Sequence, residues 1–507
     1  MLYDLSPSIG GSQLAYVNGI AATRSLSKAE QKALGQYMTP PAIARFMARR
    51  AVQGLSGSTL RILEPAAGSG VLAVAAVEAL IELTDVPANI ELLLFEIDHR
   101  LIGGLQQVCG ALQAKCADKG FSLDFRIAQE DFLLSAIARQ REPLVDLVIG
   151  NPPYFKISGQ DERALAYADV VWGQPNIYGL FLAVCADLVR SGGRYCFITP
   201  RSWMSGPYFA RVRRRVLSCL RLDALHVFDS RRDHFSEQEV LQEAVIVWGT
   251  ARVPDGLVCV SSSRGSGDLE NSVMNQLAVS ELVSASEDQV IRFPSGVAGR
   301  PLSPLEHSFA SHGLKVSTGP VIAFRAATHL RRDKTANSVP LLWLAHVKAM
   351  GVEWPIQKKH EHIAVNADNA WMLLRNGPMV ILRRFSPKED ERRVTAAPYF
   401  GNLRGDFIGI ENHLNYISRP GGTMSAKETL GLAAFLNSRT VSDHFKSMSG
   451  HTQVNATDLR ALPLPSAAEL ERMGELVDSE RSVTAADQAV AAVLGHECGR
   501  AIHSRHA

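Results

Sequence analysis

The sequence predicts an α/β fold, with a mostly parallel sheet in the first half of the chain and a separate α+β domain in the second. Short apolar runs alternate with helical stretches from about residue 36 to about residue 250, and this alternation is typical of a parallel sheet covered by helices. After about residue 300 the alternation ends, and short strands, turns and basic clusters follow. The chain has 507 residues, which is long enough for more than one domain.

The elements follow from apolar runs bounded by turn residues. Strands are expected at Leu60–Leu63, Ile90–Phe95, Asp124–Ile127, Leu144–Ile149, Gly193–Ile198 and Ala244–Trp248. Helices are expected at Val71–Leu83, Arg100–Lys119, Tyr178–Val189 and, after a Ser N-cap, within Ser466–Leu494. The small polar segment Ser261–Asp268 predicts a linker or an exposed loop. We therefore expect a variable leader (1–35), the α/β domain (36–255), a linker (256–300) and the α+β domain with a C-terminal helical segment (301–507).

Composition argues against several classes of protein. The seven cysteines form no CxxC pair and no zinc spacing, so neither a disulfide scaffold nor a metal site is expected, and a reducing cytosol suits the chain. No apolar stretch reaches about 18 residues, and the N-terminus lacks a secretory pattern, so no membrane partner is expected. The formal net charge is only +2, so a nucleic-acid binder of this composition has to concentrate its basic residues locally.

Three polar or glycine-rich segments each follow a predicted strand of the first half. Residues 61–70 (RILEPAAGSG) run from a strand through a Gly-rich turn into a helix, where the backbone can approach a ligand closely. Glu96 ends the next strand, where a carboxylate commonly accepts hydrogen bonds from ribose hydroxyls. Asp131 and Phe132 follow the third predicted strand. The Asp131 carboxylate suits an adenine amino group, and the Phe132 side chain suits the adenine ring. Each feature alone is equally compatible with a cap, a loop acid or a core residue, but their order brings all three to one crevice.

The tetrapeptide Asn151-Pro152-Pro153-Tyr154 directly follows an apolar strand. Two prolines stiffen the chain and remove two backbone donors, so the Asn151 side chain and the Pro152 carbonyl are presented as acceptors beside the flat ring of Tyr154. An amino group conjugated to an aromatic ring fits this arrangement. If both of its protons are accepted, its lone pair is left to attack a sulfonium methyl group, without a covalent intermediate. A rigid structural turn is the alternative.

These segments together resemble the amino-methyltransferases of restriction–modification systems in the γ arrangement, where the cofactor motif precedes the catalytic motif and a recognition domain follows both. Residues 35–40 (GQYMTP) are similar to that family's GQYxTP segment, and 432–465 to the end of its recognition domains. The resemblance implies a Rossmann-like methyltransferase domain that uses S-adenosylmethionine, and a second, target-recognition domain. Asn-Pro-Pro-Tyr accompanies adenine N6 methylation in this family, whereas Ser usually leads in enzymes that methylate cytosine N4.

The resemblance also assigns residues to the site. For the cofactor it implies Gln36, Tyr37, Thr39, Glu64, Pro65, Ala66, Gly68, Gly70, Glu96, Ile97, Asp131, Phe132 and Asn151. For catalysis it implies Asn151, Pro152, Pro153 and Tyr154, with Phe235 in the segment 234–238 (HFSEQ) as a second ring against an extruded base. A core phenylalanine is the alternative for Phe235.

Double-stranded DNA is the expected partner. Basic clusters occur at Arg211–Arg215, Arg331–Lys334, Lys358–His362, Arg383-Arg384 and Arg392-Arg393. A single cluster of this kind is more often a solvated face than a DNA contact, but several of them follow a methyltransferase domain here. We expect a cytoplasmic, nucleoid-associated prokaryotic protein.

Three alternatives remain open at this stage. Asn-Pro-Pro-Tyr also serves methyltransferases that act on RNA or on a protein glutamine, although these are generally shorter. A DNA-specificity subunit that has lost activity is the second alternative, against which the intact Glu64, Glu96 and Asn151 argue. A fused nuclease is the third, but only about 35 residues precede the first cofactor segment, too few for such a domain. Any cognate restriction endonuclease is therefore expected to be separately encoded, with no physical complex implied.

Overall fold

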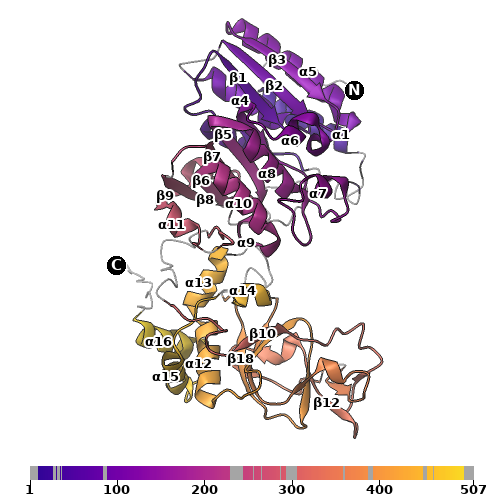
Figure 1. The fold of residues 1–507 in the computed structure, drawn as a ribbon, viewed down its shortest axis with the longest axis vertical. Helices are drawn as coiled ribbons and strands as arrows, with labels where there is room; N and C mark the ends of the chain where they lie inside the picture. Colours follow the sequence, from indigo (N-terminus) through magenta and orange to yellow (C-terminus); the bar gives the residue numbers. More distant parts are fainter. Residues whose placement is uncertain are drawn as a thin grey trace, which may run out of the picture. The chain divides into compact units, whose positions relative to one another are not determined.

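The computed structural model describes residues 10–24, 26, 30, 35, 37–83, 88–228, 244–254, 256–263, 265–285, 287–292, 305–357, 360–385, 392–448, 454–460 and 462–495. The chain forms two compact units, Met1–Phe293 and Pro294–Ala507, which Figure 1 shows in the colours of the sequence. Among the described residues, no helix combines the length and the apolar character needed to cross a bilayer.

The first unit is built on a nine-stranded sheet in the order β3-β2-β1-β4-β5-β7-β6-β8-β9. Only β7 and β9 run opposite to the other strands, which confirms the predicted α/β class with a mostly parallel sheet. The strands are β1 (Thr59–Glu64), β2 (Asn89–Phe95), β3 (Ser122–Ala128), β4 (Val145–Gly150), β5 (Val189–Pro200), β6 (Leu220–Phe228), β7 (Ala244–Ala251), β8 (Leu257–Ser263) and β9 (Val273–Ala278).

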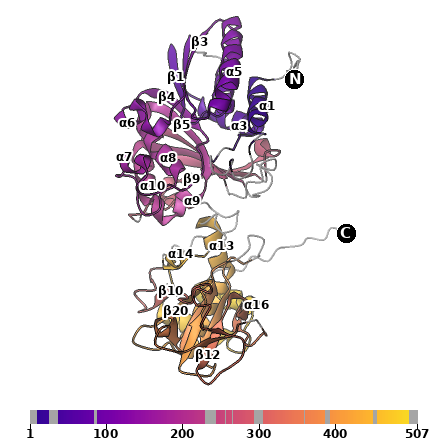
Figure 2. The same ribbon diagram turned by 90° about the vertical axis from the view of Figure 1, so that its right-hand side faces the viewer.

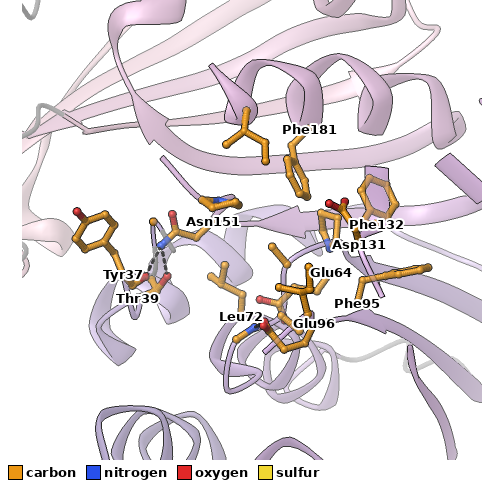
Figure 3. Close-up of a pocket in the computed structure, with 18 of the residues that line it drawn as sticks. Tyr37, Thr39, Glu64, Leu72, Phe95, Glu96, Asp131, Phe132, Asn151 and Phe181 are labelled. Atoms are coloured by element: carbon orange, nitrogen blue, oxygen red, sulfur yellow. Dashed lines mark hydrogen bonds between the residues drawn. The ribbon is translucent and has the colours of Figure 1, made fainter. Parts of the chain in front are cut away.

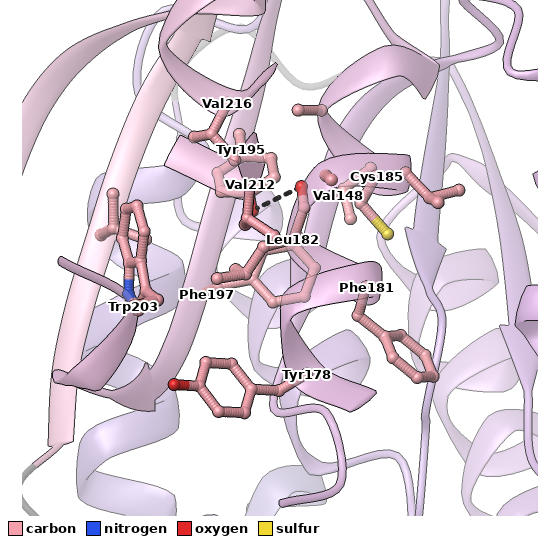
Figure 4. Close-up of a cluster of buried hydrophobic side chains, with 14 of the residues drawn as sticks. Val148, Tyr178, Phe181, Leu182, Cys185, Tyr195, Phe197, Trp203, Val212 and Val216 are labelled. Atoms are coloured by element: carbon pink, nitrogen blue, oxygen red, sulfur yellow. Dashed lines mark hydrogen bonds between the residues drawn. The ribbon is translucent and has the colours of Figure 1, made fainter. Parts of the chain in front are cut away.

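Helices cover both faces of this sheet because its central strands are apolar on both sides. On β4, Val148 packs into one cluster, with α8 and α10, whereas Leu147 and Ile149 pack into the other, with α3, α4 and α5. Figure 2 shows these two helical layers on either side of the strands, and Figure 4 shows the first cluster, around Phe181, Phe197 and Trp203. The helices are α1 (Gly11–Thr23), α3 (Pro41–Ala51), α4 (Val71–Ile81), α5 (His99–Asp118), α6 (Ala136–Gln140), α7 (Glu162–Ala166), α8 (Ile177–Leu188), α9 (Ser202–Ser205), α10 (Ala210–Cys219) and α11 (Val279–Leu282).

The first part of the expected linker, residues 256–300, is wrong. Residues 257–263 form β8, which pairs with β6 inside the large sheet. Ser261 and Ser263 are buried in this strand, and the two ring nitrogens of His226 lie 2.8 Å and 3.0 Å from their hydroxyl oxygens. Small polar residues that are typical of a loop can stand in a buried strand here because His226 satisfies the hydrogen bonds of their hydroxyl groups. The first unit extends to Phe293, beyond the expected end of the α/β domain at residue 255, and the boundary between the units lies within the expected linker.

Part of the expected leader is also structured. Helix α1 lies within residues 1–35, and its Ala15 is buried in the cluster of α3, α4 and α5. The backbone N–H of Gly11 donates to Glu78 on α4 over 3.0 Å. Helix α1 therefore belongs to the core of the first unit.

The second unit is α+β, as predicted. One antiparallel sheet has the order β10-β20-β17-β18 and a second has the order β11-β15-β12-β19-β16. The strands are β10 (Lys315–Thr318), β11 (Leu330–Arg331), β12 (Ser338–Leu342), β13 (Val347–Lys348), β14 (Gly351–Val352), β15 (His362–Ala364), β16 (Leu373–Arg375), β17 (Pro378–Arg383), β18 (Ala396–Phe400), β19 (Phe407–Ile410) and β20 (Leu414–Ser418). In the second sheet, β12 and β19 are the parallel pair.

Helices complete the second unit. They are α12 (Ala426–Asn437), α13 (Arg439–Met448), α14 (Ala456–Arg460), α15 (Ala467–Val477) and α16 (Val483–Leu494). The stretch predicted as helical from Ser466 to Leu494 is two helices, each with its own serine N-cap, Ser466 and Ser482. A Cβ on Gly431 of α12 would lie 1.7 Å from a backbone oxygen of α15, so the two helices meet backbone to backbone and only glycine fits between them.

Candidate active site

A cavity of about 240 Å³ lies beyond the carboxyl ends of β1, β2 and β4. Figure 3 shows Tyr37 and Thr39 at one end of it and Phe95, Asp131 and Phe132 at the other. A crevice outside the carboxyl ends of parallel strands is the usual ligand site of open α/β sheets. The predicted residues that line it are Tyr37, Thr39, Glu64, Pro65, Ala66, Gly68, Glu96, Ile97, Asp131, Phe132, Asn151 and Pro153.

Of the five other predicted residues, three are absent from the cavity lining and two are not described. Gly70, Pro152 and Tyr154 do not line the cavity. Gln36 and Phe235 lie outside the described residues. The structure therefore brings most of the predicted cofactor residues together, and of the Asn-Pro-Pro-Tyr motif it places Asn151 and Pro153 at the cavity.

The Gly-rich turn after β1 adopts conformations that favour glycine. Gly68 and Gly70 have φ of +57° and +84°, in the region that other residues rarely enter. Gly70 is the N-cap of α4, and a Cβ there would lie 2.6 Å from Leu105. Gly70 thus permits close packing against α5, whereas Gly68 faces the cavity.

Two buried carboxylates brace this turn from below. The Glu96 carboxylate accepts the backbone N–H of Gly68 over 2.7 Å and that of Asp98 over 2.8 Å, and Glu64 accepts the N–H of Ala73 on α4 over 2.9 Å. Burial raises the pKa of both side chains, that of Glu64 well above its ordinary value, and the negative charge of Glu96 raises the pKa of Glu64 further. A cation bound beside these two carboxyl groups would favour their ionised forms and so oppose that rise in pKa.

The opposite end of the cavity combines one acid, one arginine and a group of rings. Asp131 accepts the N–H of Leu133 over 2.9 Å and lies 3.5 Å from the Arg163 guanidinium. Burial raises the pKa of Asp131, while Arg163 opposes that shift. Phe132 is buried and stacks on Phe181 of α8 at 5.6 Å.

Asn151 is held in one orientation at the end of β4. Its amide nitrogen donates to the backbone oxygen of Tyr37 and to the hydroxyl of Thr39, each over 3.0 Å. A backbone carbonyl can only accept a hydrogen bond, so the end of the Asn151 amide that points toward Tyr37 has to be the NH2 group. The Asn151 oxygen is therefore directed the other way, where the Tyr154 hydroxyl donates to it.

Tyr154 does not present a free face in this structure. Its ring is buried and stacked on Tyr37 at 5.9 Å, with Tyr178 edge-on at 6.0 Å. Its hydroxyl also donates to the backbone oxygen of Ile198 over 3.0 Å. The expectation of an open ring beside Asn151 therefore differs from the structure, because the apolar ring is covered by its neighbours in the core.

Sequence reasoning missed residues that the fold brings in from elsewhere. Arg163 on α7 and Phe181 on α8 line the cavity, but neither stands in a recognisable pattern. Four carboxylates and one arginine line it in total, and the exposed Ile97 (62 % exposed) adds an apolar contact at its edge. This set fits S-adenosylmethionine, whose sulfonium and ammonium groups carry positive charge and whose adenine is flat and apolar.

The basic clusters of the sequence divide into buried and exposed arginines. Arg213 of α10 is fully buried and donates to three backbone oxygens. Arg392 forms a two-bond ion pair with Asp487, and Arg393 is buried. Arg332 and Lys334 are exposed, while Lys358 and Lys359 lie outside the described residues. Arg213, Arg392 and Arg393 thus hold the fold together.

Comparisons with known proteins agree with this site. Residues 115–235 match the family of Eco57I restriction-modification methylases. The chain is 31 % identical over 471 residues to the type II methyltransferase M.PstI of Providencia stuartii, covering 90 % of this chain and 92 % of that protein. It is 29 % identical over 474 residues to the type II methyltransferase M.BsuBI of Bacillus subtilis, covering 88 % and 90 %.

Solved structures share the fold of both units. The type IIL restriction-modification enzyme MmeI, determined in complex with DNA, matches with a TM-score of 0.62 at 11 % identity, over 96 % of this chain and 79 % of that one. The DrdV–DNA complex matches with a TM-score of 0.53 at 13 % identity, over 93 % and 60 %. The chain therefore belongs to the type II DNA methyltransferases of restriction–modification systems, whose cofactor is S-adenosylmethionine.

Proposed function

We propose that this methyltransferase transfers a methyl group to N6 of an adenine that it extrudes from a specific duplex sequence. The observation that carries the proposal is the fixed Asn151 amide at the cavity, whose oxygen points away from Tyr37 and Thr39. An oriented acceptor at this point suits an amino group that has to be held by its protons.

The residues of the cavity would divide the cofactor between them. S-Adenosylmethionine supplies an electrophilic methyl group on a positively charged sulfur. Glu96 would accept hydrogen bonds from the ribose hydroxyls, and Asp131 would accept one from the adenine amino group. The buried Glu64 and Glu96 carboxylates would favour binding of the positively charged cofactor, and Ile97 offers an apolar surface to its adenine ring.

Asn151 and Pro152 would prepare the target nitrogen. The Asn151 oxygen would accept a hydrogen bond from one N6 proton, and the Pro152 carbonyl would accept one from the other. These two hydrogen bonds keep the lone pair of the nitrogen from delocalising into the adenine ring. In this structure the Tyr154 hydroxyl donates a hydrogen bond to the Asn151 oxygen. Arrival of the base would displace that hydroxyl, and movement of Tyr37 or Tyr154 would then free a ring face for stacking.

Extrusion of the base and choice of sequence require further contacts. Unstacking one base costs a few kcal/mol, which stacking on protein rings offsets. We assign Tyr154 and Phe235 to that role, and the second unit to target recognition. A restriction endonuclease that cuts the same sequence would be a separately encoded functional partner.

The experiment is expression of the chain in a bacterial host that lacks DNA methyltransferases. Mass spectrometry of the nucleosides, with methylome sequencing, is expected to show N6-methyladenine at one short sequence motif. Asn151→Ala is expected to remove the mark, whereas the exposed Asn89→Ala is the matched control and should keep it. N4-Methylcytosine instead, or methylation confined to RNA or to protein glutamine, would overturn the proposal.

A further inference from the structure

The five-stranded sheet of the second unit has an inner and an outer face. On the inner face, Ile408 and Ile410 of β19 pack with Met379 and Ile381 of β17, which belongs to the other sheet. On the outer face, Leu341 of β12 forms a small separate core with Val321, Ala326, Ile363, Met372 and Leu373. Side chains of one strand alternate between faces, so β12 and β16 each contribute to both cores.

Two short segments cover this small outer core. Residues 322–329 place Ala326 in it, and residues 366–372 place Met372 in it. The segments touch, because His329 Nδ1 lies 3.2 Å from Asn366 Nδ2. The first segment is also anchored at Val321, which is fully buried and forms a bridge with Glu411. Both segments are therefore fixed to the sheet by their buried residues.

Each segment also presents a large aromatic side chain to solvent. Phe324 is 78 % exposed and Trp371 is 70 % exposed. Phe407 of β19 is 44 % exposed and lies opposite Arg375 on β16. Arg375 stands two residues from the outer-core Leu373, and so Arg375 and Phe407 share the outer face. In the described part of the second unit, Leu476 is the remaining large hydrophobic residue with comparable exposure.

Positive charge accompanies these rings. The Arg325 guanidinium lies 5.4 Å from the centre of the Phe324 ring, and Arg375 and Arg404 are exposed. Across residues 322–334, 366–376 and 404–407 the sequence has six Lys and Arg residues and three Asp residues. A patch that pairs flat rings with excess cations matches a polyanion made of flat bases.

We propose that this outer face, defined as residues 322–334, 366–376 and 404–407, is the surface with which the second unit contacts duplex DNA. Phe324 and Trp371 contact bases or wedge between them, and Arg325 and Arg375 bind phosphates. The assignment rests on the proposed function, because it presumes that the chain methylates DNA at a chosen sequence. The buried anchors of both segments hold the contacting residues in place before DNA arrives, which lowers the entropy lost on binding.

The test uses the full-length chain and fluorescently labelled 24-bp duplexes, one random in sequence and one carrying the motif found by methylome sequencing. Phe324→Ala and Trp371→Ala are each expected to weaken binding of the motif duplex between about 5-fold and about 100-fold. Arg325→Ala and Arg375→Ala should weaken both duplexes and reduce the salt slope by about one each. Leu476→Ala and Arg472→Ala, both exposed on α15, are the matched controls and should change neither.

Thermal unfolding and cofactor binding should be the same in all variants, because the replaced side chains lie at the surface. If the four outer-face variants bind both duplexes as the controls do, while the unaltered chain methylates its motif, the outer face is not the DNA surface. If these variants change the sedimentation of the protein without DNA and leave DNA affinity intact, the face serves a second copy of the chain. If the unaltered chain methylates no adenine, the proposed function fails instead.

Discussion

Two regions of this methyltransferase, helix α10 of the first unit and the outer face of the second, use their arginines in opposite ways. On α10, Arg213 is buried and Arg215 pairs with the buried Asp187. The exposed Arg211 and Arg214 of the same helix donate to a backbone oxygen and to Glu287. On the outer face of the second unit, Arg325 and Arg375 stand apart in the sequence but remain exposed beside aromatic rings. Clustering of arginines in a sequence therefore says less about DNA contact than an exposed arginine next to an exposed ring.

The same contrast holds for the sign of charge at the two candidate surfaces. Four carboxylates and one arginine line the cavity of the first unit, whereas cations outnumber acids on the outer face of the second. A cationic cofactor and a polyanionic duplex would then each find a complementary surface on a different unit. Removing the second unit, or altering single residues of the first, tests this separation of charge.

Expression of residues 1–293 alone is expected to leave cofactor affinity within about twofold and to lower affinity for the motif duplex to the non-specific level. For a typical site-specific DNA-binding protein that difference is about 10³-fold or more. Calorimetric titration of cofactor and fluorescence anisotropy of the duplex measure the two affinities. The cut has to follow Phe293, because a cut near residue 265 removes β9 from the sheet. A fragment that still methylates the same motif selectively would place recognition in the first unit.

Asn151→Ala is expected to lower the single-turnover rate of methyl transfer about 10²- to 10³-fold, because one oriented acceptor for the target amino group is lost. Duplex affinity should stay unchanged, since the second unit is intact. Rapid-quench transfer from labelled cofactor gives the rate. A rate like that of the control Asn89→Ala would remove Asn151 from the mechanism.

Arg163→Met is expected to make cofactor binding more sensitive to acid. Burial raises the pKa of Asp131 and Arg163 opposes the shift, so loss of Arg163 raises that pKa further and Asp131 becomes protonated at a higher pH. The neutral acid loses a charge-assisted hydrogen bond, which lowers affinity about tenfold or more at the acid end. Cofactor titrations across pH 5 to 8 should show the acid limb moved to higher pH. The exposed Arg139→Met is the control, and an identical limb in both variants would contradict the coupling.

Tyr154→Phe is expected to give the smallest change, an increase in transfer rate of up to about tenfold, because the arriving base no longer has to displace a hydroxyl from the Asn151 oxygen. The ring stays, but the hydroxyl that donates to Asn151 and to Ile198 is lost, and one such bond contributes about 0.5–1.5 kcal/mol. The same rapid-quench measurement applies. A rate as low as that of Asn151→Ala would mean that the hydroxyl acts in the reaction itself.

Much of the first unit could be predicted because its signals are local. Each predicted strand before residue 250 is present, and the residues at successive strand ends meet because parallel strands end at one edge. Prediction failed where long-range contacts decide. The serines of β8 look like a loop until His226 satisfies them, and Arg163 reaches the cavity only through the position of α7.

The second unit offered fewer local signals. Its strands are short and mostly antiparallel, and β12 pairs with β19 across more than 60 residues of sequence. No spacing of Phe324, Trp371 and Phe407 in the sequence suggests that they share a face. The ring of Tyr154 shows the same limit in the first unit, since the motif identifies the residue but the packing of Tyr37 and Tyr178 decides what its ring contacts.

The separate outer core of the five-stranded sheet bears on how such an enzyme changes its target over time. The segments at 322–329 and 366–372 are anchored through a few residues of that core, and the helices α12 and α15 belong to a different core whose glycine contact tolerates no side chain. Substitutions in the exposed positions of these segments therefore leave the scaffold unaffected. A lineage can drift to a new DNA sequence through them while its catalytic machinery and stability are inherited unchanged.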